Sequence, residues 1–113
     1  MAVVLGTLPT TAQKWALFDL DWTLIRPVTT QTRPTLAGGP FCLQTNDWAF
    51  IPGRIERLQD FVREGWSLGI ISNQKATGKR LETVNARMQN IYQALTQYFP
   101  QIILLYSTEE NVY

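Results

Sequence analysis

Three short apolar segments, separated by two longer segments of helical periodicity, constrain the fold of this chain most strongly. The apolar segments are Lys14–Phe18, Trp66–Ile71 and Gln101–Tyr106, each of a length typical of a buried strand. A strand–helix–strand order favours right-handed parallel crossovers. The alternation therefore predicts an α/β fold, a Rossmann-like doubly wound parallel sheet, formed as a single domain over residues 1–113.

The two helices are predicted from apolar residues that recur every three or four positions. The first helix begins at Pro52 and ends at Gly65, because proline suits a first helical turn and glycine ends a helix. The second helix runs from about Thr77 to Tyr98, and Pro100 ends it. The expected core positions of both helices are Ile55, Leu58, Phe61, Val62, Leu81, Val84, Met88, Ile91 and Leu95.

Length and composition limit the classes of function. The 113 residues, 45% of them hydrophobic, suffice for one small domain with its own core. A net charge of +1 leaves no broad basic surface, so any contact with nucleic acid must be local. Histidine is absent, which excludes Ser-His-Asp and Cys-His catalysis. Cys42 is the only cysteine, so no intrachain disulfide can form, which favours a reducing, intracellular compartment, the cytoplasm or nucleus. No segment has the length of a membrane span, and Met1–Leu8 is predicted to form a peripheral strand.

Two aspartates follow the first apolar segment. Asp19 lies at the carboxyl end of the predicted strand, where open α/β sheets bind their ligands, and Asp21 comes two positions later. In a tight turn both carboxylates can face one crevice, where a proton or a cation must separate their charges. Because carboxylate oxygens are ligands that Mg²⁺ prefers, we expect a magnesium site at Asp19 and Asp21.

A second polar group, Ser72-Asn73-Gln74, follows the second apolar segment. A parallel neighbour brings this group beside Asp19, since the carboxyl ends of parallel strands meet at one edge of the sheet. Hydroxyl, amide and backbone N–H groups are suitable donors to phosphate oxygens. We therefore expect Ser72 to bind a phosphate, next to Asn73 and Gln74.

The two polar groups together resemble two motifs of the haloacid dehalogenase superfamily, most of whose members are phosphatases. The segment 19–23 is similar to the first motif, Asp-x-Asp-x-Thr, and the segment 70–74 is similar to the second. Gly78, Lys79 and the upstream pair Asp47-Trp48 narrow the resemblance to the polynucleotide kinase 3′-phosphatase family. The likeness extends from about Ala16 to Tyr113, nearly the whole chain.

This resemblance implies a role for each motif residue. Asp19 is the implied nucleophile, which forms an aspartyl-phosphate, and Asp21 is the implied general acid and base. Mg²⁺ would bind the Asp19 carboxylate and the backbone carbonyl of Asp21. The implied substrate-binding residues are Thr23, Ser72, Asn73, Gln74 and Lys79. The implied reaction is hydrolysis of 3′-phosphate ends of DNA during repair.

One residue of the first motif departs from the family pattern. Trp22 stands where the family usually has glycine, so the turn must use ordinary backbone angles or tolerate strain. The indole ring either stacks on a base of the substrate or packs within the protein. Both interpretations stay open.

Other residues around the motifs also allow two interpretations. Lys75, Lys79 and Arg80 either contact a nucleic-acid backbone or form a solvated face. Trp48 and Phe50 either stack bases or anchor their loop to the core. The segment from Arg26 to Asn46 is rich in proline, glycine and threonine and is predicted to be a flap loop over the site, in place of a large cap.

The resembled family also uses a lysine and a further acidic group from later strands, and neither is present before Tyr113. We therefore expect the chain to be a fragment or a truncated gene product. Its possible partners are the missing C-terminal part of this domain and a kinase domain. The strand at Trp15–Phe18 is then left at a sheet edge, unless a second chain or the N-terminal strand covers it. Two alternatives to a DNA 3′-phosphatase share these motifs: a sugar- or histidinol-phosphate phosphatase, and a non-catalytic domain that binds phosphorylated ligands.

Overall fold

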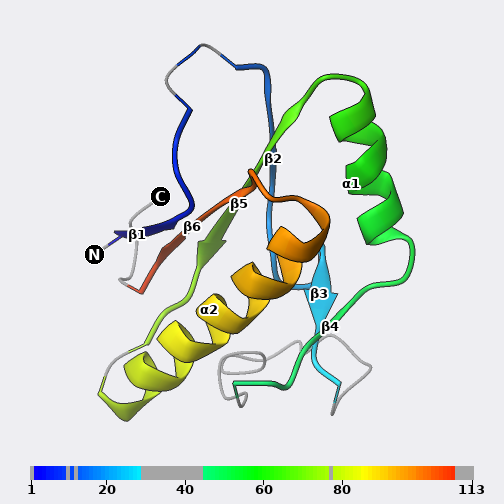
Figure 1. Cartoon of the computed structure of the whole chain (residues 1–113). Coiled ribbons are helices and arrows are strands. Elements are labelled where there is room, and N and C mark those ends of the chain that lie inside the picture. The colour runs from blue at the N-terminus through cyan, green and yellow to red at the C-terminus, as the bar shows by residue number, and fades with distance from the viewer. Residues whose placement is uncertain (1, 10, 12, 29–44, 77, 109–113) are drawn as a thin grey trace.

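The computed structural model describes residues 2–9, 11, 13–28, 45–76 and 78–108 (Figure 1). The elements, in chain order, are β1 Ala2–Leu5, β2 Trp15–Phe18, β3 Ile25–Arg26, β4 Ala49–Phe50, α1 Arg54–Arg63, β5 Ser67–Asn73, α2 Lys79–Tyr98 and β6 Ile103–Ser107. The three strands predicted from the apolar segments are β2, β5 and β6, and both predicted helices are present. The strand–helix alternation of the sequence is therefore confirmed.

The main sheet has the strand order β1-β6-β5-β2. β2 runs parallel to β5, and β5 runs parallel to β6, so both predicted crossovers are parallel. β1 confirms the peripheral N-terminal strand, but it pairs antiparallel with β6 and makes the sheet mixed, where a wholly parallel sheet was predicted. Because β1 lies at the opposite edge, β2 is an edge strand of the described sheet, as expected.

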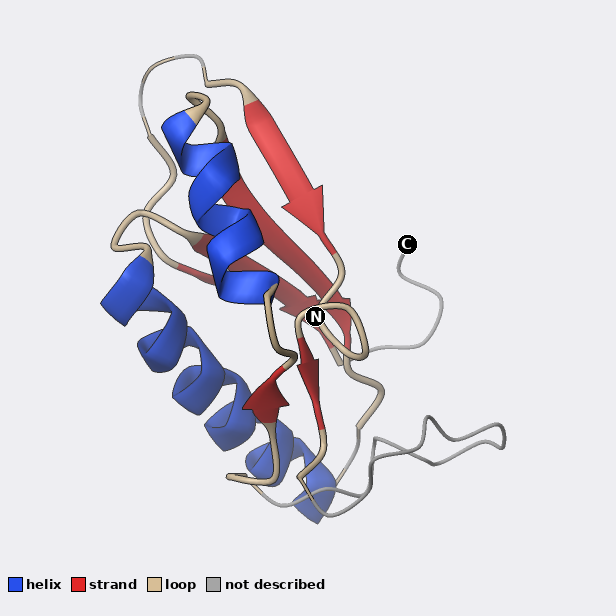
Figure 2. Ribbon diagram, turned by 90° about the vertical axis from the view of Figure 1, so that its right-hand side faces the viewer, coloured by secondary structure: helices blue, strands red, loops and turns tan. Residues whose placement is uncertain are grey.

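Both helices pack on the same face of the main sheet (Figures 1 and 2). The chain moves from β2 to β5 and on to β6 in one direction across the sheet. Successive right-handed crossovers in one direction place their helices on one side. The prediction of a doubly wound sheet, with helices on both faces, is therefore wrong for the described part of the chain. Neither described helix combines the length and the apolarity needed to cross a membrane.

The hydrophobic core lies between this face of the sheet and the helices. The sheet contributes Ala16, Leu68, Ile70, Leu104 and Tyr106, and α2 contributes Val84, Met88, Ile91 and Leu95. The predicted apolar stripe of α2 is thus confirmed, except that Leu81 is only half-buried. Burial of one large aliphatic side chain stabilises a protein by about 1.5–3 kcal/mol, so this layer fixes the strands whose ends carry the polar motifs.

The bounds of α1 differ from the prediction at its start. The helix begins at Arg54, after Gly53 at φ 84°, and Pro52 lies outside it. Gly65 ends the helix as predicted: it has φ 93°, and its N–H donates to the Val62 carbonyl at 3.0 Å. Val62 itself is 47% exposed and is not the core residue that its spacing predicted. The face of a ten-residue helix that meets the sheet is narrow, so only Ile55 and Leu58 are buried.

A second, two-stranded sheet lies beyond the carboxyl end of β2. In this antiparallel ladder Ile25 of β3 pairs with Phe50 of β4, and Arg26 pairs with Ala49. The ladder joins the two ends of the proline- and glycine-rich segment. Residues 29–44 lie outside the described residues, so the flap loop stays a prediction.

Candidate active site

The turn that follows β2 is tight. The Leu20 carbonyl accepts hydrogen bonds from the N–H groups of Thr23 (3.2 Å), Leu24 (2.9 Å) and Ile25 (3.2 Å). Trp22, inside this turn, has φ 62°, a left-handed conformation that favours glycine. The sequence allowed either ordinary backbone angles or strain at this position. The structure has the strained conformation. The indole Nε1 of Trp22 is buried and has no hydrogen-bond partner among the described residues.

Arg54 fixes the same turn from the start of α1. Its Nε donates to the Thr23 carbonyl at 2.8 Å. Arg54 is exposed and Thr23 is half-buried, so this contact lies at the rim of the motif. The contact explains how the first turn of α1 and the turn after β2, thirty-one positions apart, keep a fixed relation.

Asp21 meets the carboxyl end of β5 through Gln74. The Gln74 Nε2 donates to Asp21 Oδ2 at 2.6 Å and to Ser72 Oγ at 2.7 Å. A primary amide carries two N–H donors, so both are used inside the protein. The structure thus brings together three of the residues predicted for one site. Gln74, however, donates to its neighbours and has no N–H left to offer a phosphate in this arrangement.

Arg87 belongs to the same cluster, and the sequence analysis missed it. Its Nη1 lies 3.7 Å from Asp21 Oδ1, and the residue is only 3% exposed. One signal in the sequence could have revealed it. Arg87 lies three residues after Val84 and directly before Met88, on the apolar stripe of α2, where a charged side chain must be buried.

The electrostatics of the cluster follow from its burial. Desolvation raises the pKa of Asp21 above the ordinary value of 3.8, and the charge of Asp19 acts in the same direction. Arg87 and the hydrogen bond from Gln74 act against this rise. Because desolvation is the largest of these effects, the net effect of the surroundings is to raise the pKa of Asp21.

The other predicted site residues divide into exposed and buried ones. Asp19, Asn73 and Lys79 are exposed, so a ligand can reach them without rearrangement of the protein. Ser72 is 2% exposed, and its Oγ accepts the hydrogen bond from Gln74. Asp19 is thus the exposed carboxylate of the motif, and Asp21 is the half-buried one.

The aromatic residues at β4, Trp48 directly before it and Phe50 within it, pack into the protein. The rings of Trp48 and Phe50 meet edge to face with centroids 5.2 Å apart, and Phe50 also lies 6.2 Å from the ring of Tyr98 on α2. Both residues pack against the hydrophobic core. The structure therefore supports the anchoring interpretation of Trp48 and Phe50.

The comparison with known families agrees with the two motifs. A family model described as polynucleotide kinase 3 phosphatase matches residues 14–113. The chain belongs to this family. The resemblance predicted over Ala16–Tyr113 is thereby confirmed, and with it a function related to the polynucleotide kinase 3 phosphatases. No match to the chain is found among the curated proteins.

The two family motifs bring few metal-binding side chains together in the described part of the chain. No group of three described His, Cys, Asp or Glu side chains is placed to hold a metal ion. Mg²⁺, however, needs no dedicated cage, since it commonly binds one or two carboxylates together with waters and substrate phosphate. The exposed carboxylate of Asp19 and the backbone carbonyl of Asp21 fit that pattern.

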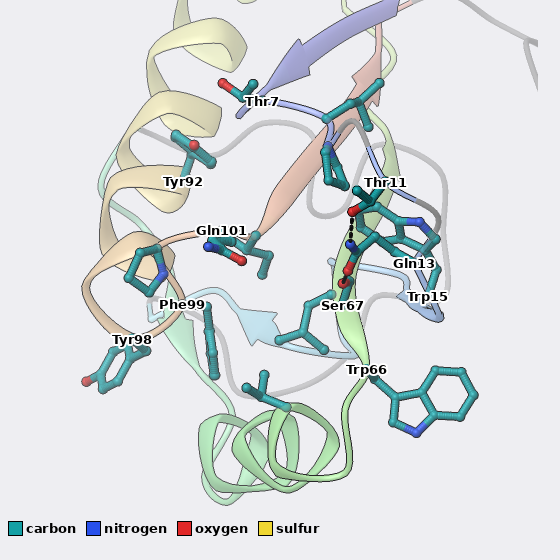
Figure 3. A pocket seen from close by; sticks show the side chains of 16 residues that line it. Thr7, Thr11, Gln13, Trp15, Trp66, Ser67, Tyr92, Tyr98, Phe99 and Gln101 are labelled. Atoms are coloured by element: carbon teal, nitrogen blue, oxygen red, sulfur yellow. Dashed lines mark hydrogen bonds between the residues drawn. The ribbon is translucent and has the colours of Figure 1, made fainter.

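A cavity of about 900 Å³ lies at the other end of the strands from the family motifs (Figure 3). Trp15 and Ser67, which begin β2 and β5, line it together with Tyr92 and Phe99. Gln13 donates to Thr11 Oγ1 at 3.0 Å and accepts from Ser67 Oγ at 2.7 Å along one wall. The polar residues of the motifs lie at the carboxyl ends of the same strands, so this cavity is no part of the candidate active site.

Proposed function

We propose that this chain supplies the nucleophile and the general acid of a Mg²⁺-dependent phosphomonoester hydrolase that acts on 3′-phosphate ends of DNA through an aspartyl-phosphate. The observation that carries the proposal is the presence, in the turn after β2, of an exposed Asp19 and a half-buried Asp21 whose two carboxylate oxygens are each contacted by another side chain. A nucleophile must reach the phosphorus, whereas a general acid must hold a proton in a fixed position. The two environments suit these two roles.

The first step forms a bond between a carboxylate oxygen of Asp19 and the phosphorus. The bond between the phosphorus and the 3′ oxygen breaks, and Asp21 gives its proton to that oxygen. The attacking carboxylate and the phosphate both carry negative charge. When bound by Asp19 and the Asp21 carbonyl, Mg²⁺ reduces the repulsion between them.

The second step restores the enzyme. Asp21, now ionised, accepts a proton from a water molecule that attacks the phosphorus, and the bond between Asp19 and the phosphorus breaks. The products are inorganic phosphate, an ionised Asp19 and a protonated Asp21. The hydrogen bond from Gln74 and the nearby Arg87 stabilise the ionised Asp21 between the two steps.

The test is release of phosphate, with Mg²⁺ present, from a 3′-phosphorylated oligonucleotide and from a small phosphomonoester such as glycerol phosphate. We expect the oligonucleotide to be preferred and Asp19→Asn to lower turnover by about 10³-fold or more. The matched control is Glu56→Gln, which removes an exposed carboxylate from α1 and should leave turnover unchanged. Preference for the small ester would contradict the DNA substrate, and turnover that survives Asp19→Asn would contradict the mechanism.

A further inference from the structure

We infer that Arg87 is a positioning residue for the phosphatase reaction: its guanidinium holds the Asp21 carboxyl where that group can exchange a proton with the leaving oxygen. The inference rests on the proposed function, and it adds a residue from α2 to a site that the motifs confine to the ends of β2 and β5. Three features of the structure support it.

The first feature is that Asp21 is held from two sides. Arg87 Nη1 lies 3.7 Å from Oδ1, and Gln74 Nε2 lies 2.6 Å from Oδ2. The two contacts come from different elements, α2 and the end of β5. With one contact on each oxygen, the carboxyl cannot rotate about its bond to Cβ without losing one of them. Among the described residues, removal of Arg87 leaves only the contact from Gln74 to fix the orientation of this carboxyl.

The second feature is that stability does not explain the burial of this arginine. The Nε and Nη2 atoms of Arg87 are buried and have no hydrogen-bond partner among the described residues. Unmade hydrogen bonds to a buried charged group cost free energy, and apolar side chains of similar volume often replace buried ion pairs without loss of stability. Arg87 shares the buried face of α2 with Val84, Met88 and Ile91, all of them apolar.

The third feature is the distribution of charge around the guanidinium. Both Asp21 and Asp47 favour its charged form, whereas desolvation opposes it. Asp47 also accepts the N–H of Val28 at 2.8 Å, at the base of the segment that β3 and β4 hold. The charge of Arg87 is therefore favoured by two carboxylates, and the contact that the structure shows for its guanidinium is the one with Asp21.

The experiment compares two substrates in full-length Arg87→Met and Arg87→Lys variants. A 3′-phosphorylated oligonucleotide has an alcohol leaving group that needs a proton, whereas p-nitrophenyl phosphate has a leaving group that departs without one. We expect Arg87→Met to lower kcat for the oligonucleotide by about 10–100-fold with KM within about twofold. The loss of p-nitrophenol release in the first turnover should be smaller, and Arg87→Lys should restore part of kcat because it keeps the charge. The matched control is Arg57→Met, at an exposed position of α1. It should leave kcat for both substrates unchanged.

Equal losses on both substrates, or a change in KM alone, would overturn the inference. A double-mutant cycle with Asp21→Asn separates positioning from folding, since a positioning effect requires the Asp21 carboxyl and should vanish without it. If Arg87→Met does not unfold cooperatively, the cycle uses Arg87→Lys, with the same expectation. Failure of the proposed function has a different signature: the wild-type chain would then show no Asp19-dependent hydrolysis of either substrate.

Discussion

Gln74 Nε2 lies 2.6 Å from Asp21 Oδ2, and this hydrogen bond joins the carboxyl end of β5 to the turn after β2. The two residues are 53 positions apart in the chain. The same amide donates to Ser72 Oγ at 2.7 Å, so one side chain links both family motifs. The motifs are therefore connected directly, through side chains, as well as through the parallel pairing of their strands.

Replacement of Gln74 by methionine should destabilise the protein. The change keeps the volume of the side chain but leaves Asp21 and Ser72 without their amide donor, and unsatisfied buried groups cost about 1–3 kcal/mol. The measurement is the free energy of unfolding in urea. The control is Gln97→Met, at an exposed position on α2. Equal losses from the two variants would contradict the role given to Gln74.

Replacement of Trp22 should reveal the strain in the turn. Because Trp22 has φ 62°, a residue with a Cβ is disfavoured there by about 1–2 kcal/mol relative to glycine. Trp22→Gly and Trp22→Ala both remove the ring and its buried Nε1, and they differ only in the Cβ. We expect the glycine variant to be the more stable one by about 1 kcal/mol. Greater stability of the alanine variant in urea would show that the turn is unstrained.

Alkaline pH should destabilise the protein through Tyr106. Burial raises the pKa of its phenol above 10.0, and its O–H donates to Asn85 Oδ1 at 2.7 Å. The unfolded chain therefore loses this proton at a lower pH than the folded protein does. The stabilising contribution is fully present below pH 10.0 and is lost as the pH rises through the folded-state pKa.

The measurement for Tyr106 is the free energy of unfolding in urea between about pH 8 and pH 11. The decline at the alkaline end should be smaller in Tyr106→Phe, which has no phenol to ionise. Tyr98→Phe, at an exposed position, should keep the wild-type decline. If Tyr106→Phe keeps the wild-type pH profile, the alkaline decline in the free energy of unfolding is caused by other groups.

Addition of Mg²⁺ should stabilise the folded chain if Asp19 and the Asp21 carbonyl bind it. A ligand that binds only the folded state adds about 2.7 kcal/mol at a concentration one hundred times its Kd. The measurement is the Tm with and without Mg²⁺. Asp19→Asn should abolish the shift in Tm, whereas Glu56→Gln should keep it. An equal shift in both variants would indicate a cation site elsewhere.

Local patterns in the sequence were enough to predict much of the fold. The three parallel strands β2, β5 and β6 and the two helices follow from apolar spacing and from glycine and proline positions, which act over a few residues. The meeting of the two polar motifs follows from parallel pairing, since Asp19 follows β2 and Ser72 lies near the carboxyl end of the neighbouring β5. The family was also predictable from local patterns, because each of its two motifs is a short, contiguous stretch of sequence.

The sequence alone determined which polar residues stand at the carboxyl ends of β2 and β5, and so it located the candidate site and its exposed carboxylate, Asp19. Only the tertiary structure decided which side chains contact Asp21, because Gln74 and Arg87 come from distant positions and the contact from Arg87 depends on how α2 packs on the sheet. The placement of both helices on one face was also beyond local patterns, since an apolar stripe does not specify which side of a sheet it will cover. Periodicity reports that a side chain is buried, whereas the identity of its neighbours is fixed only when the layers pack.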